Sequence, residues 1–120
     1  MKDHSNSLTW DDFEKVEMRV GTILEATPFE KAKKPAYQLK IDFGPLGIKK
    51  SSAQITQHYQ PNDLIGKQVI AVVNFPPKQI ANFFSECLVL GIYQQGGAVV
   101  LLQPERSVEN GDKIGWIKQL

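Results

Sequence analysis

Apolar and polar residues alternate along much of this chain with a period of two, the spacing of a half-buried β-strand. The alternation is cleanest over residues 37–43, whose expected inward positions are Tyr37, Leu39, Ile41 and Phe43. Together with a β-branched run, the pattern predicts strands at 16–25, 37–43, 48–55, 68–74, 87–93 and 98–102. Helical signals are confined to residues 9–15, with Thr9 as N-cap, and a turn within 57–66. We therefore predict an all-β protein, a five-stranded antiparallel barrel with short terminal helical extensions.

The first predicted strand is long, and strict alternation places Val20 and Leu24 on one face and Ile23 on the other. Gly21 within this strand indicates a bend or a close approach of another segment. The turn-forming residues 44–47 predict that the next two strands form an antiparallel hairpin. One face of that hairpin is then expected to carry Lys50, Ser52 and Gln54.

The composition, with 42% hydrophobic and 22% charged residues among 120, is that of one folded domain. We expect residues 1–8 to be a flexible tail and residues 9–120 to form that domain. The formal net charge of +1 conceals a basic segment, because residues 31–50 hold six lysines and only Asp42 as an acid. Clustered lysines neutralise phosphates and release counterions, so this segment predicts an anionic partner.

The sequence contains no recognisable catalytic or metal-binding motif. His4 and His58 lie in polar segments without metal-ligand spacing, and the single cysteine, Cys87, lies among apolar residues as a buried structural thiol. No nucleotide-binding loop or nucleophile elbow is present. We therefore predict a protein that is not an enzyme and has no metal site or cofactor. No apolar stretch approaches the roughly 18 residues of a membrane helix, and the polar N-terminus has no apolar signal core, which predicts a cytoplasmic protein without membrane insertion.

Two further groups of residues are candidates for binding. Prolines end the strand at 68–74, so the aromatic residues that follow can stack on bases or accept an apolar peptide segment: Phe75, Phe83 and Phe84. The alternative is that they plug the barrel end. The second group exceeds what a barrel core needs and predicts the contact of a two-fold homodimer: Trp10, Phe13, Trp116, Ile117 and Leu120. Its alternative is that both chain ends fold onto the barrel as plugs.

Three sequence blocks carry a family resemblance: Val20–Ile23, Lys49–Ile55 and Val72–Ile80, followed by Ser85–Leu88. Their order and spacing resemble the tRNA-binding domain family, an OB-fold module found alone and attached to tRNA synthetases. From about residue 11 to 117 the chain is similar to a bacterial branch of that family, the export-related chaperones that also bind tRNA. The wider family usually has Gly-Met where this chain has Cys87-Leu88.

This resemblance implies an OB-fold homodimer that binds tRNA through shape and backbone contacts and acts as a chaperone for exported preproteins through apolar pockets. By position, it implies an RNA-binding strip of Lys49, Lys50, Ser51, Ser52, Gln54, Asn74, Lys78, Ser85 and Glu86. The charge distribution adds Lys33 and Lys34. We therefore expect a non-catalytic tRNA-binding protein with export-related chaperone activity. The alternative is a chaperone that binds unfolded preproteins in apolar pockets, with incidental RNA binding.

Overall fold

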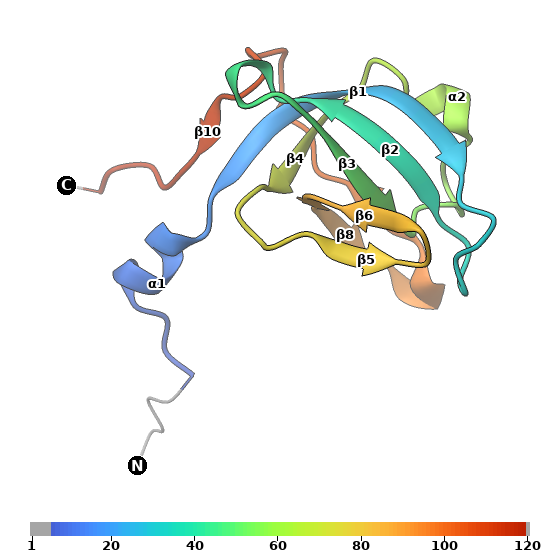
Figure 1. Ribbon diagram of the computed structural model, residues 1–120. Coiled ribbons are helices and arrows are strands. Elements are labelled where there is room, and N and C mark those ends of the chain that lie inside the picture. Colours follow the sequence, from blue (N-terminus) through green and yellow to red (C-terminus); the bar gives the residue numbers. More distant parts are fainter. Residues whose placement is uncertain (1–5, 120) are drawn as a thin grey trace.

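The computed structural model describes residues 6–119 and consists mainly of strands, with few short helices (Figure 1). The elements in chain order are α1 (Trp10–Lys15), β1 (Met18–Pro28), β2 (Tyr37–Asp42), η1 (Gly44–Leu46), β3 (Ile48–Ala53), α2 (Pro61–Leu64), β4 (Gln68–Val72), β5 (Lys78–Ile80), β6 (Phe83–Ser85), β7 (Leu88–Val89), β8 (Gly91–Tyr93), η2 (Gln95–Gly97), β9 (Val99–Leu101) and β10 (Lys113–Ile114). The predicted short N-terminal helix is confirmed, since the Thr9 hydroxyl accepts a hydrogen bond from the Asp12 amide over 3.1 Å. The expected tail at residues 1–8 lies mostly outside the described residues.

The long strand β1 organises the sheet, whose order is β3-β2-β1-β4-β7, with every pairing antiparallel. One half of β1 pairs with β2 and the other half pairs with β4 and β10. The segment before β7 then meets the free edge of β3, where the Glu86 amide donates to the Lys50 carbonyl over 2.7 Å. Because this contact joins the two ends of the sheet, the strands form a nearly closed barrel, and the predicted all-β barrel is confirmed.

The barrel core follows from the alternation along β2. The four predicted inward residues are all buried: Tyr37, Leu39, Ile41 and Phe43. Gly21 of β1 lies directly against them, since an added Cβ there would lie 2.6 Å from Ile41 Cγ2 and 2.8 Å from the Phe43 ring. The predicted close approach is therefore confirmed. Complete burial of a side chain of this size contributes roughly 1.5–3 kcal/mol, so this inner row is a major source of stability.

Strict alternation holds along β1 as far as Ile23 and fails after it. A β-bulge between Ile23 and Glu25 shifts the register against β2. Ile23 and Ala26, three residues apart, are both buried, although strict alternation would place them on opposite faces, and Leu24 between them is 40% exposed. A bulge adds one residue to one strand and reverses the facing of the residues that follow, which alternation alone does not reveal.

The segment from residue 75 to 93 also differs from the prediction. The expected strand at 87–93 is divided into β7 and β8, and the two-residue turn Ala81–Asn82 joins β5 and β6 into a hairpin that was not predicted. Ala81 adopts a φ of 53°, in the left-handed region that usually selects glycine or asparagine. Because alanine is not a typical residue for this conformation, the sequence did not indicate a turn here. No helix in the described part of the chain is long and apolar enough to cross a membrane.

Candidate nucleic-acid interface

The two predicted lysines of β3 point in opposite directions. The register pairs Lys50 with Lys40 and Ser52 with Gln38, so these four side chains share the outer face of the β2–β3 hairpin. We call them the outer face. Lys49 instead pairs with the buried Ile41 and lies on the opposite side of β3. Neighbouring residues of a strand alternate in direction, so Lys49 and Lys50 do not form one contiguous strip.

Ser51 occupies the core and does not belong to an exposed RNA-binding strip. Its side chain is fully buried, and its hydroxyl donates to the Cys87 carbonyl over 2.9 Å. The neighbouring Cys87 thiol is also buried and lies 3.8 Å from the Lys50 carbonyl. Burial raises the pKa of Cys87 to about 11. The expected structural thiol is thus found at the seam that closes the barrel.

The outer face concentrates positive charge at Lys40 and Lys50. Like charges directly opposite each other across two strands are destabilising unless a counter-charge lies nearby. Lys40 Nζ lies 3.6 Å from Glu25 Oε2, which offsets part of this repulsion. Lys40 was counted in the basic segment but was not predicted as a binding residue. The turn at 44–47 sets the register that aligns it with Lys50, and that register was the available signal.

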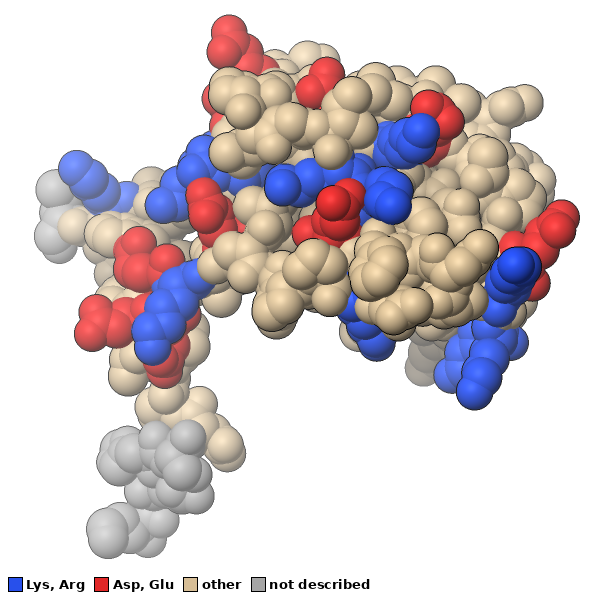
Figure 2. Space-filling view, viewed as in Figure 1, with Lys and Arg blue, Asp and Glu red and all other residues tan. Residues whose placement is uncertain are grey.

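The basic loop, residues 29–36 between β1 and β2, extends this charge. Lys33 and Lys34 are exposed, and Lys34 lines a small pocket together with Gln54, so the structure brings these two predicted residues together. Figure 2 shows basic side chains in a row over β2 and β3, with a second group at the lower right, where this loop lies. The loop lysines and the outer face therefore lie along one side of the barrel.

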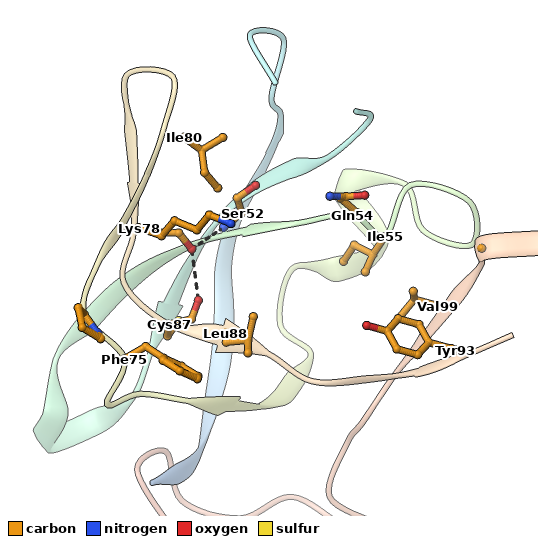
Figure 3. Close-up of a pocket in the computed structure, with 13 residues that line it drawn as sticks. Ser52, Gln54, Ile55, Phe75, Lys78, Ile80, Cys87, Leu88, Tyr93 and Val99 are labelled. Carbon is orange, nitrogen blue, oxygen red and sulfur yellow. Dashed lines mark hydrogen bonds between the residues drawn. The ribbon is translucent and has the colours of Figure 1, made fainter. Parts of the chain in front are cut away.

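The β5–β6 hairpin adds a further lysine beside β3. Lys78 and Ser85 are register partners, and the Ser85 hydroxyl accepts from the Ser52 amide over 3.2 Å. Figure 3 shows the Lys78 side chain extended toward Ser52. The predicted residues Ser52, Lys78 and Ser85 therefore do lie together, although the hairpin that joins them was not foreseen.

Asn74 and Glu86 make hydrogen bonds within the protein. Asn74 accepts from the Glu17 amide over 3.0 Å and donates to the Lys15 carbonyl over 2.6 Å, which fixes the connection between α1 and β1. Glu86 Oε1 accepts from the Lys50 amide over 2.9 Å at the barrel seam. This hydrogen bond holds Glu86 against the edge of β3.

The three predicted phenylalanines do not form one site. Phe75 is 58% exposed and lines a groove of about 680 Å³, whereas Phe83 is 8% exposed and packs against Phe29. Phe84 is 48% exposed and does not line this groove. The structure therefore supports a packing role for Phe83, and not an exposed surface for a base or peptide.

The groove combines apolar and polar side chains from β3, β5, β6, β7, β8 and β9 and from the segments between them (Figure 3). Its lining residues are Ser52, Gln54, Ile55, Phe75, Pro76, Lys78, Ile80, Ser85, Cys87, Leu88, Tyr93, Gly97 and Val99. Tyr93 and Val99 were not predicted; they are partners in the β8–β9 hairpin, and the fold places this hairpin beside Ser52 and Phe75. No local motif marks such a long-range assembly.

The chain ends contact each other instead of covering the barrel. The rings of Trp10 and Trp116 have centroids 5.3 Å apart, and the Trp116 indole donates to Glu14 Oε1 over 2.6 Å. Both tryptophans remain substantially exposed, and Ile117 is 91% exposed. Figure 1 shows α1 and the C-terminal segment on the same side of the barrel, projecting away from it. The alternative of terminal plugs is therefore wrong; of the predicted dimer residues, Phe13 is partly buried and Leu120 lies outside the described residues.

Residues 18–113 match the family model described as "Putative tRNA binding domain". Among curated proteins, methionine–tRNA ligase of Bacteroides fragilis is 36% identical over 108 residues, which is 90% of this chain. The chain spans only 16% of that ligase's length. The similarity therefore concerns one region of the ligase.

Two solved structures are similar over nearly their full length. The chaperone CsaA from Bacillus anthracis is 54% identical with a TM-score of 0.87, and the match covers 90% of this chain and 98% of that one. The CsaA chaperone protein from Picrophilus torridus is 57% identical with a TM-score of 0.85, covering 90% and 99%. This chain therefore belongs to the tRNA-binding domain family and, within that family, to the CsaA proteins.

Proposed function

We propose that this protein binds tRNA, without catalysis or a cofactor, through the outer face of its β2–β3 hairpin together with Lys33, Lys34 and Lys78. The observation that carries the proposal is the cross-strand pair Lys40–Lys50, which concentrates two ammonium groups on one face. Phosphates of an RNA backbone supply the matching negative charge. Gln38 and Ser52 lie beside the lysines and have groups that can hydrogen-bond phosphate or ribose hydroxyls. The proposal places the protein in the cytoplasm.

A titration with total tRNA at several salt concentrations tests this proposal. Each lysine–phosphate contact adds about 0.7–0.9 to the slope of log affinity against log salt, or about fivefold to eightfold in affinity at 0.1 M salt. We expect the Lys40→Ala/Lys50→Ala variant to lose close to two such contacts. The matched control, Lys67→Ala/Arg106→Ala, removes the same charge from residues that line a separate small groove. Equal binding by the two double variants would show that the outer face is not the site.

We propose, as a second function, that the groove beside the outer face binds unfolded, exported preproteins. Its apolar lining, including the exposed Phe75 and Tyr93, supports this function, as does the name chaperone of the two CsaA relatives. Apolar contacts depend weakly on salt, unlike lysine–phosphate contacts. If preprotein binding is the principal function, RNA binding by the lysines is incidental.

Suppression of the aggregation of an unfolded secretory precursor tests this second function. We expect a folded Phe75→Ser/Leu88→Ser variant to lose suppression and to keep tRNA affinity within about twofold. Phe84→Ser is the matched control, because Phe84 is 48% exposed but does not line the groove. Full suppression by the groove variant, or equal loss in the Phe84 variant, would remove the groove from the proposal.

We also propose that two chains form a homodimer through the terminal aromatic residues. Trp10 is 61% exposed, Trp116 is 46% exposed and Ile117 is 91% exposed, and these residues are adjacent in the fold. Exposed aromatic and apolar residues that adjoin one another are typical of a subunit interface. Sedimentation equilibrium is expected to give twice the chain mass of 13.5 kDa.

A further inference from the structure

A second apolar cluster lies apart from the barrel core. It consists of the buried residues Phe29, Ala36 and Phe83, against which Ala32 and Ile80 pack. Phe29 and Ala36 belong to the basic loop, and Phe83 belongs to the β5–β6 hairpin. The Phe29 and Phe83 rings have centroids 5.3 Å apart at an interplanar angle of 58°. The cluster therefore joins the basic loop to the β5–β6 hairpin, which is distant in sequence, and we name Phe29, Ala36 and Phe83 the clasp.

The clasp holds one side of the basic loop and leaves its lysines exposed. The Phe29 amide donates to the Ala36 carbonyl over 3.0 Å, and the Ala32 amide donates to the Phe29 carbonyl over 3.3 Å. These bonds close the loop at its base. The lysines of the loop, Lys31, Lys33 and Lys34, form no salt bridge with any residue that the structure describes. Their charge is available to a partner.

The clasp also contacts the outer face. Lys50 Nζ lies 5.2 Å from the centroid of the Phe83 ring, within the range of a cation–π interaction. Phe83 and Lys50 line a small pocket of about 240 Å³ together with Gln38 and Lys40. The same ring thus packs against Phe29 on the loop and lies under the ammonium group of Lys50.

We propose that the clasp is a positioning device: it fixes the basic loop beside the outer face, so that the loop lysines and Lys50 engage one RNA backbone together. The inference rests on the proposed tRNA binding. A free eight-residue loop would have to be ordered when RNA binds, and that ordering lowers affinity. Packing Phe29 on Phe83 orders the loop beforehand. The loop lysines then contribute to affinity only while the clasp is intact.

A double-mutant cycle tests the clasp. The four proteins are the unchanged protein, Phe83→Ala, Lys33→Ala/Lys34→Ala, and the variant that combines all three substitutions, each titrated with total tRNA over a salt series. Loss of two phosphate contacts lowers affinity by about 25-fold to 60-fold at 0.1 M salt and lowers the salt slope by about 1.4–1.8. We expect Phe83→Ala to lose at least as much as the lysine variant. We expect the combined variant to bind within about twofold of Phe83→Ala.

Additive losses in the combined variant would overturn the inference, because the lysines would then act without the clasp. Phe83→Leu is the matched conservative variant, since it keeps an apolar side chain against Phe29 and should bind within about threefold of the unchanged protein. Hydrogen exchange gives an independent readout: the Phe29 and Ala32 amides should exchange faster in Phe83→Ala, while the amides of β2 keep their protection. Unchanged exchange at both loop amides would also overturn the inference. If Phe83→Ala does not fold, Phe29→Ala removes the other ring and the same cycle applies.

The cycle separates failure of the clasp from failure of tRNA binding. If the unchanged protein shows no salt-dependent binding, or if Lys40→Ala/Lys50→Ala binds like its matched control, the proposed function fails and the clasp inference fails with it. If both tests support tRNA binding but the cycle is additive, only the clasp fails.

Discussion

Two aromatic pairs in this protein have the same ring separation and opposite surroundings. The centroids of Phe29 and Phe83, and those of Trp10 and Trp116, are 5.3 Å apart, and both pairs are tilted. Phe29 and Phe83 are 5% and 8% exposed, whereas Trp10 and Trp116 are 61% and 46% exposed. The geometry of a pair therefore does not distinguish its role. The apolar area removed from water does, because that area determines whether the rings stabilise the chain itself or remain available to another surface.

The largest effect is expected from removing a ring of the buried pair. Phe29→Ala should lower the free energy of unfolding by about 3 kcal/mol, the lower end for a buried phenylalanine, because the clasp is a small cluster. Trp10→Ala should cost less than about 1 kcal/mol within a single chain, since its ring already contacts water. Urea denaturation of both variants at one low protein concentration, with Phe29→Leu as the conservative control, measures the difference. Equal losses would mean that exposure does not separate the two pairs.

Removing a ring of the exposed pair, Trp10 and Trp116, should weaken the proposed dimer. Trp116→Ala is expected to weaken the proposed dimer by at least 2 kcal/mol, or about 30-fold in Kd, because buried aromatic anchors dominate interface energies. The salt slope and affinity for tRNA per chain should stay unchanged at concentrations where both proteins are monomers. Sedimentation velocity over a dilution series measures the Kd, and Tyr93→Ala is a control, since Tyr93 is 89% exposed but lies away from the chain ends. A Kd that Trp116→Ala leaves unchanged would place the interface elsewhere.

The sequence predicted the regular strands correctly and the bulge and the β5–β6 hairpin incorrectly, and the reason is physical. Alternation identified the inward row of β2, since a regular strand repeats every two residues. It failed after Ile23, where a bulge resets the facing. The strip implied by the family resemblance included both Lys49 and Lys50, although alternation directs them to opposite sides of β3. Terminal tryptophans beyond the needs of the core did indicate an exposed cluster. Phe83 and Phe84 look alike in sequence, and only the β5–β6 hairpin decides which one is buried.

The candidate site was also predicted only in part. The basic segment located the lysines, because charge is read directly from composition. The groove residues Tyr93 and Val99 were not found, because the groove joins their hairpin to Ser52 and Phe75, which lie far from it in sequence. The barrel-closing role of Ser51 was also missed, since a serine in a polar stretch carries no sign of burial. Periodicity predicts local secondary structure but not contacts between residues that are far apart in sequence.

A smaller effect is expected at the seam of the barrel, where Cys87 belongs to the main core and not to the cluster of the buried pair. Burial raises the pKa of Cys87 from 9.0 to about 11. Below pH 9 the thiol is protonated in both states; above it, the unfolded chain ionises first, so stability falls as pH rises toward 11. Between pH 8 and 10 we expect a loss of about 1 kcal/mol beyond that of Cys87→Ala. Urea denaturation at both pH values measures it, and parallel pH profiles for the two proteins would show that water reaches the thiol.

The smallest effect is expected from the hydrogen bond at the exposed pair. The Trp116 indole donates to Glu14 Oε1 over 2.6 Å, with both side chains open to solvent. Trp116→Phe keeps a ring against Trp10 and removes this donor, so it should cost only about 0.5 kcal/mol per chain, because water replaces an exposed hydrogen bond readily. In a two-fold dimer both copies lose the bond, which gives about a fivefold increase in Kd by sedimentation. Glu14→Gln, which keeps an acceptor, should change Kd by less. A loss in Trp116→Phe as large as that in Trp116→Ala would show that this bond, and not the aromatic surface, holds the chain ends for assembly.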